Sequence, residues 1–161
     1  MRSLFLLMAV FLWTCIVAEP SDSCLGVVAR VDKRMSLLNE KDMRAFLQAF
    51  ADHKCENNVE FAEWGNELIF KAIEQRPYLF FNTLFKLNQK EIAIIKREFE
   101  NPINDIIDLS HSRKAVLDAP DISPDLRERA LDIIDLGCKR QQEEIREWEN
   151  KNGKKWIWND R

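Results

Sequence analysis

The sequence predicts an all-α protein, a compact bundle or short array of about seven helices that follows an N-terminal signal peptide. Three observations lead to this prediction. Apolar residues recur at helical spacing, helix-start signals stand at short intervals, and the 161 residues include only four glycines and five prolines. No Asn-Gly turn separates alternating apolar segments, so we do not expect β-hairpins.

Residues 1–18 have the pattern of a secretory signal peptide. One arginine precedes an apolar run over 4–18, and acidic residues begin only at Glu19. The run is shorter than the roughly 20 residues that a membrane-spanning helix needs, so a retained anchor is the weaker interpretation. Cleavage after Ala18 leaves 19–161 as a single helical domain, exported to the periplasm or the extracellular space, with no further segment able to cross a membrane.

The cysteines leave their pairing open. Cys15 lies at the end of the apolar run, where bacterial lipidation is an alternative to simple cleavage. The mature chain keeps Cys24, Cys55 and Cys138, an odd number, so one pair can bridge and one thiol is left over. A bridge from Cys24 to Cys55 would contribute about 3–4 kcal/mol, and one from Cys55 to Cys138 closes a longer loop. The remaining thiol is buried, reactive, or linked to another chain.

The charge of the mature domain excludes one broad class of function. Loss of Arg2 leaves 23 basic residues of the original 24, against 27 acidic ones, a net charge of −4. Proteins that bind nucleic acid need a surplus of lysine and arginine to displace counterions. We therefore expect no nucleic-acid partner.

Four helices are expected in the first half of the domain. The first covers 24–38, and the second starts at an N-cap on Asn39 and ends near Cys55. Asn57-Asn58 breaks the pattern and can cap the third, and Pro77 opens a fourth that runs to Leu87. The stripes of the second and third helices are Met43, Phe46, Leu47 and Phe50, and then Phe61, Trp64, Leu68 and Ala72, widened by Ile69 and Ile73.

Three or more helices are expected in the second half. Asn88 and Glu91 form a capping-box pattern, and Asn101-Pro102 is a second start signal before a short apolar face at Ile103, Ile106 and Ile107. A short helical turn is expected over 113–117. Ser123-Pro124-Asp125 opens the last helix, which Asn152-Gly153 ends. Its stripe comprises Leu126, Ala130, Ile133, Ile134, Gly137, Cys138, Ile145 and Trp148.

No pattern predicts catalysis, a metal or a cofactor. His53 stands two residues before Cys55, a spacing at which helical side chains diverge. The pairs His53–Glu56 and Asp108–His111 offer two ligands each, whereas a zinc site needs three or four. We therefore expect no catalytic residue, metal or cofactor, and an uncharacterised enzyme is only the third alternative.

An aromatic cluster gives the alternative function. Large aromatic side chains gather between the third and fifth expected helices. Two interpretations are open: they line a cavity for an apolar small molecule such as a fatty acid, or they form the core of the bundle. Aromatic residues at helical spacing favour a core. The ligand-binding candidates are Phe70, Tyr78, Phe80, Phe81 and Phe85.

The tail at 154–161 gives the leading function. Basic and tryptophan side chains stand close together after the last helix, a composition that suits docking on a protein partner or resting at lipid headgroups. The alternative is that the tryptophans fold back and close the core. We expect an exported, non-enzymatic module that binds an unidentified protein through these candidates: Trp148, Lys154, Lys155, Trp156 and Trp158.

Overall fold

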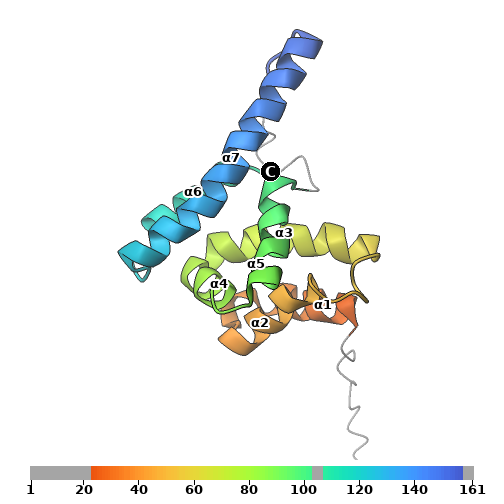
Figure 1. Ribbon diagram of the computed structural model, residues 1–161, viewed down its shortest axis with the longest axis vertical. Coiled ribbons are helices and arrows are strands. Elements are labelled where there is room, and N and C mark those ends of the chain that lie inside the picture. Colours follow the sequence, from red (N-terminus) through yellow and green to blue (C-terminus); the bar gives the residue numbers. More distant parts are fainter. Residues whose placement is uncertain (1–22, 103–106, 158–161) are drawn as a thin grey trace, which may run out of the picture.

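The computed structural model describes residues 23–102 and 107–157, and the expected signal peptide with Cys15 lies outside this part. The described residues form seven α-helices, one short 3₁₀ helix (η1, Met35–Leu37) and no strand, so the all-α prediction is confirmed (Figure 1). The α-helices are α1 (Cys24–Lys33), α2 (Glu40–Ala49), α3 (Val59–Gln75), α4 (Pro77–Leu84), α5 (Gln89–Glu100), α6 (Leu109–Asp118) and α7 (Pro124–Asn152).

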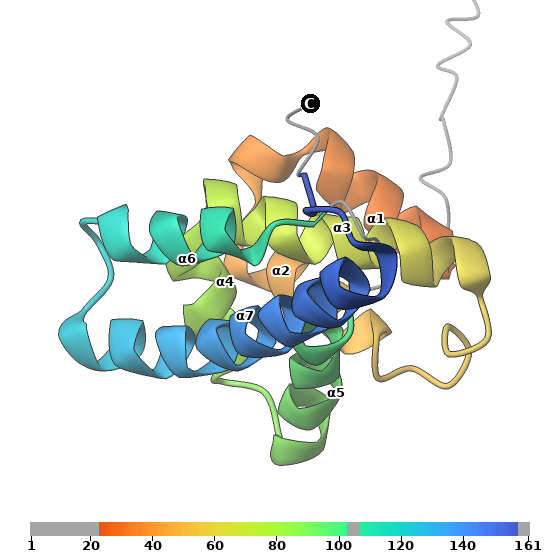
Figure 2. The ribbon, with the colours of Figure 1, turned by 90° about the horizontal axis from the view of Figure 1, so that it is seen from above.

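Helix α3 lies at the centre of the body, where it packs against α1, α4 and α6. The first half of α7 packs against α5 and α6, and it lies beside α6 in both ribbon views (Figures 1 and 2). The second half of α7 continues past this contact and projects from the body (Figure 1). None of the helices in the described ranges is both long and apolar enough to cross a membrane.

Side-chain caps start most of the helices where the sequence predicts them. Asn39 accepts from the Asp42 amide at 3.0 Å, and Asn58 does the same for the Phe61 amide at 2.9 Å. Ser123 accepts from the Leu126 amide at 3.3 Å. These bonds satisfy amide groups that have no partner inside the helix. Short polar side chains therefore fix the boundaries that the apolar spacing alone leaves loose.

The capping box of α5 gives a testable prediction. The Asn88 side chain accepts from the Glu91 amide at 3.0 Å, and the Glu91 side chain accepts from the Asn88 amide at 3.0 Å. We expect Asn88→Ala to lower the free energy of unfolding by about 1 kcal/mol, because one amide loses its acceptor. Urea denaturation measures this. The neighbouring Gln89→Ala is the control, and an equal loss in both variants would contradict the role of the cap.

Three predicted helices are shorter in the structure. The segment expected as one helix over 24–38 ends as α-helix at Lys33 and tightens into η1, which buries Met35. Helix α2 ends at Ala49, not near Cys55, because successive turns over 50–57 reverse the chain before α3. Likewise α4 ends at Leu84, before Leu87.

Two other boundaries differ in the second half. Helix α6 spans ten residues instead of the short turn at 113–117, because Asp108 accepts from the Ser110 amide at 2.9 Å and starts the helix earlier. Asn101 is the C-cap of α5, and the residues of the helix predicted to start at Asn101-Pro102 lie mostly in 103–106, outside the described residues. Most of the apolar face expected there lies outside the described residues, except for Ile107, which is buried.

The core is a cluster of aliphatic and phenylalanine side chains to which all seven described α-helices contribute. Rings meet edge to face, with centroids 5.1 Å apart for Phe80 and Phe81 and 5.5 Å apart for Phe70 and Phe99. Such arrangements contribute beyond the area that they bury. The largest fully buried side chains are Phe46, Phe80, Phe81, Phe99, Met43, Leu47, Ile69, Ile73, Leu84, Ile95, Leu109 and Ile134.

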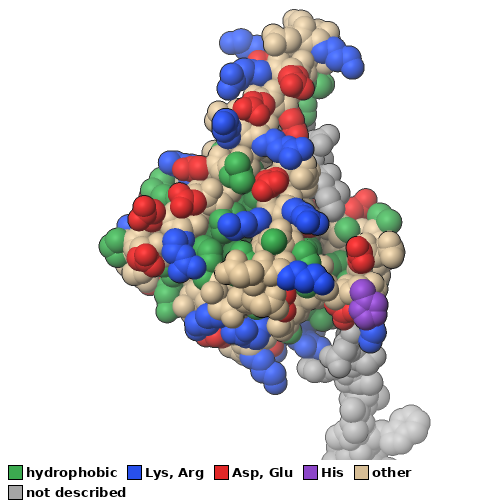
Figure 3. Space-filling model, in the orientation of Figure 1, with side chains coloured by type: hydrophobic (Ala, Val, Ile, Leu, Met, Phe, Trp, Pro, Cys, Tyr) green, Lys and Arg blue, Asp and Glu red, His purple; other side chains and the backbone are tan. Residues whose placement is uncertain are grey.

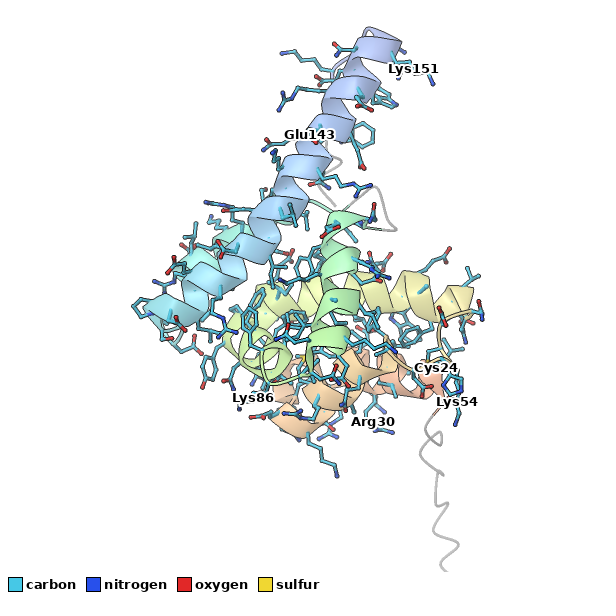
Figure 4. All side chains as sticks on the ribbon, viewed as in Figure 1. Cys24, Arg30, Lys54, Lys86, Glu143 and Lys151 are labelled. Carbon is cyan, nitrogen blue, oxygen red and sulfur yellow. A yellow bond between two sulfur atoms is a disulfide. The ribbon has the colours of Figure 1, made fainter. Side chains whose placement is uncertain are left out.

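A disulfide joins Cys24, the first residue of α1, to Cys55 in the turns before α3. The two residues are 31 positions apart, and the alternative pairing of Cys55 with Cys138 is excluded because Cys138 is free. Figure 4 shows Lys54, the neighbour of Cys55, beside Cys24. The bond ties the start of α1 to the entry of the central helix.

Candidate binding sites

The described residues offer no cluster that would hold a metal ion: no group of three or more His, Cys, Asp or Glu side chains lies together within them. His53 is exposed, with its Nδ1 3.4 Å from Asp52 Oδ1. Burial and the neighbouring Asp135 raise the pKa of the Cys138 thiol, which disfavours the thiolate that nucleophilic catalysis needs. The third alternative, an enzyme, stays an untested prediction.

The aromatic ligand candidates lie in two different environments. Phe70, Phe80 and Phe81 are buried in the core and in contact with other rings. Tyr78 is 41 % exposed, and Phe85 is half-buried beneath the Arg129 guanidinium, 3.9 Å from the ring centroid. A ligand among the three buried rings would have to displace core side chains. The hypothesis that the protein carries an apolar ligand among these rings therefore stays a prediction.

The projecting end of α7 brings together two of the five predicted partner-binding residues. Gly153 ends the helix in the left-handed conformation (φ 64°) and turns the chain back. The Trp156 ring then meets the Trp148 ring edge to face, with centroids 5.2 Å apart, and the Trp156 amide donates to Glu149 Oε1 at 2.8 Å. The tail thus folds back on the last turns of α7, and we call this pair with the adjoining tail the tryptophan tip.

The tryptophan tip lies away from the core. Neither Trp148 nor Trp156 belongs to the hydrophobic cluster of the body or to the side chains packed against it. Figure 4 places Glu143 midway along the projecting part of α7 and Lys151 near its end. On the face seen in Figure 3, charges of both signs cover this part of the helix.

Exposed basic and apolar groups surround the ring pair. Lys151, Lys154 and Lys155 are exposed. Ile157, the last described residue of the tail, is 80 % exposed. Trp158 lies outside the described residues, so its predicted role stays a prediction. The tryptophan tip therefore combines two tryptophan rings in contact, one exposed isoleucine and three exposed lysines.

A second site was not predicted from the sequence. The turns that follow α2, together with α3 and α5, enclose a surface pocket of about 480 Å³. The rings of Phe50 and Phe61 line it, with centroids 5.0 Å apart. Other lining residues include Asp52, His53, Cys55, Glu56, Ala62, Lys90, Ala93, Ile94, Arg97 and Glu98.

The carboxyl of Glu98, one of three that line this pocket, accepts a hydrogen bond from a buried amide. Asn66 on α3 is fully buried, and its Nδ2 donates to Glu98 Oε2 at 2.8 Å. Burial raises the pKa of the Glu98 carboxyl, and the hydrogen bond from Asn66 lowers that pKa by a smaller amount. The sequence contains one sign of this site. Asn66 lies on the same helix face as Ile69 and Phe70, three and four residues later, so a polar side chain stands among apolar ones.

The raised pKa of Glu98 predicts a pH-dependent difference between wild type and Glu98→Gln. Because protonation favours the folded state, the stability of wild type relative to the variant should fall as the pH rises from 4.5, the ordinary value, through the raised pKa. Below 4.5 the difference should level off. Thermal denaturation across pH measures it, with Glu100→Gln as a matched charge control. A pH-independent difference for Glu98→Gln would contradict the desolvated carboxyl.

No family model matches the chain, and no curated protein or solved structure matches it either. Function therefore has to be argued from the two sites themselves, the tryptophan tip and the pocket beside α5.

Proposed function

We propose that the protein is an exported, non-enzymatic interaction module that binds a protein partner through the tryptophan tip. The observation that carries this proposal is the position of Trp148 and Trp156: both rings lie outside the core, at the end of a helix that projects from the body. Large aromatic side chains dominate the binding energy of protein interfaces when a partner excludes water from them. A ring pair outside the described core cluster is suited to that use.

The tip also indicates the chemistry of the partner. Lys151, Lys154 and Lys155 are exposed around the rings, and Lys151 lies at the very end of the helix (Figure 4). A complementary surface would hold an apolar slot for the rings and carboxylates along its rim. Charges of this kind raise the association rate and select the partner, while the rings supply most of the affinity.

The double variant Trp148→Ala/Trp156→Ala tests the proposal. We expect it to keep the circular dichroism spectrum of wild type and to lose only the contact between the two rings, because neither ring belongs to the core cluster. Chemical crosslinking of the protein in its native secretome should yield a specific adduct that this variant loses at least tenfold. Leu117→Ala, which truncates an exposed apolar side chain on α6, is the matched control and should keep the adduct.

Two results would overturn the proposal. An adduct that survives the double variant places the contact elsewhere. A chain ended at Asn152 that no longer folds shows that the tail closes the structure instead of binding a partner.

Export is part of the same proposal and has its own measurement. The Cys24–Cys55 disulfide suits an oxidising compartment, because cytosolic thiols are kept reduced. We expect the purified mature protein to begin at Glu19 in N-terminal mass spectrometry. A chain that still begins at Met1, or one that carries a lipid on Cys15, would contradict cleavage after Ala18.

A further inference from the structure

The pocket beside α5 has an apolar wall of the kind that holds small molecules. Phe50 and Phe61 present neighbouring rings, and Ile94 adds an aliphatic side chain from α5. The volume of about 480 Å³ falls within the range of roughly 300–1,000 Å³ that is usual for small-molecule sites. This wall suits a ligand with an apolar group.

The Glu98 carboxyl, which lines the pocket, is held in place by a hydrogen bond from a buried side chain. Asn66 lies on the apolar side of α3 and is fully buried, although an aliphatic residue there would avoid the cost of burying an amide. Its Nδ2 donates to Oε2 of Glu98 and so orients the carboxyl, which lines the pocket. Among the described residues, no lysine or arginine forms a salt bridge with Glu98. A carboxylate held in this way is matched by a ligand ammonium group.

Two cations also line the pocket. Lys90 and Arg97 both line the pocket, and their separation of seven residues places them on one face of α5, two turns apart. Arg97 directly precedes Glu98, so opposite charges occupy neighbouring positions on the helix. Across the pocket, the turns after α2 contribute Asp52 and Glu56, which leaves the site as a whole close to neutral.

We propose that this pocket binds a small zwitterion that carries an ammonium, a carboxylate and an apolar group, the class to which the apolar α-amino acids belong. The ammonium contacts Glu98, the carboxylate contacts Arg97, and the apolar group lies on Phe50 and Phe61. Both side chains line the same pocket, so one small ligand can contact the carboxyl of Glu98 and the guanidinium of Arg97 through opposite charges. This site is separate from the tryptophan tip and does not depend on the proposed partner.

Isothermal titration of the purified full-length mature chain with L-phenylalanine and L-leucine tests the proposal. We expect saturable binding of one molecule per chain. Two analogues separate the charges: 2-phenylethylamine lacks the carboxylate, and 3-phenylpropanoate lacks the ammonium. Each should bind at least tenfold more weakly than phenylalanine. Chemical shifts of the Ala62 and Ala93 amides, which line the pocket, should move on titration and so place the ligand there.

Glu98→Gln removes the charge and keeps an oxygen that accepts from Asn66, so the variant should fold and lose at least tenfold in affinity for phenylalanine. Arg97→Gln should weaken phenylalanine but leave 2-phenylethylamine unchanged. Glu100→Gln makes the same charge change as Glu98→Gln on the same helix, outside the pocket lining, and should bind as wild type does.

Three outcomes would overturn the proposal. The first is the absence of saturation by either amino acid at tens of millimolar. The second is equal affinity for phenylalanine and 2-phenylethylamine, which would leave the carboxylate without a role. The third is equal affinity in Glu98→Gln and Glu100→Gln. The double variant at Trp148 and Trp156 should keep full amino-acid binding, so failure here and failure of the tryptophan tip are distinguishable.

Discussion

Replacing Gly137 by alanine is expected to lower the free energy of unfolding by about 2–3 kcal/mol, despite the better helix propensity of alanine. A Cβ at this position on α7 would lie 2.5 Å from the backbone oxygen of Phe99 and 2.9 Å from Leu109 Cδ1. The first contact is with backbone at the end of α5, which cannot rotate away as a side chain does. The two helices would have to separate, and the core side chains between them would lose contact.

The other glycines supply matched controls for this prediction. At Gly65 the added Cβ meets the tip of the Phe50 ring at 2.9 Å, a flexible side chain that can shift. At Gly153 nothing lies within 4 Å, but the left-handed backbone (φ 64°) costs a non-glycine residue roughly 1–2 kcal/mol. Urea denaturation should therefore show the largest loss for Gly137→Ala. A variant as stable as wild type would contradict the close crossing of α5 and α7.

The sequence predicted the features that depend on a few neighbouring residues. Asn39, Asn58, Asn88 and Ser123 cap helices because a side-chain oxygen reaches an amide two or three positions ahead, whatever surrounds the helix. Boundaries failed where tertiary contacts decided them. The turns over 50–57 end α2 early, and they bring Cys55 to Cys24, which is 31 residues away.

The sites depend on contacts that no local pattern specifies. Asn66 and Glu98 are 32 residues apart, and only the packing of α3 near α5 makes their hydrogen bond visible. Periodicity placed Ile134, Ile145 and Trp148 on one stripe of α7. It indicates which face is apolar but not whether a neighbour covers that face. The body buries Ile134, whereas Trp148 lies outside the described core cluster and meets the ring of Trp156 in the returning tail.

The second large effect is expected from the disulfide. Cys55→Ala should lower the free energy of unfolding by about 3–4 kcal/mol, because the bond removes chain entropy from an unfolded loop of this length. The loss should fall first on α1, which the bond ties to the turns before α3. Urea denaturation of Cys55→Ala, and of wild type with and without a reductant, measures the effect.

Cys138→Ala is the control that separates the two pairings left open by the sequence. Cys138 is a half-buried free thiol on α7, so its loss removes a small apolar contact and no cross-link. We expect the free energy of unfolding of Cys138→Ala to differ from that of wild type by less than about 1 kcal/mol. A reductant should destabilise this variant as much as it destabilises wild type. If Cys138→Ala instead lost as much stability as Cys55→Ala, those two residues would form the bond. Helix α1 would then be held by packing against α2 and α3 alone.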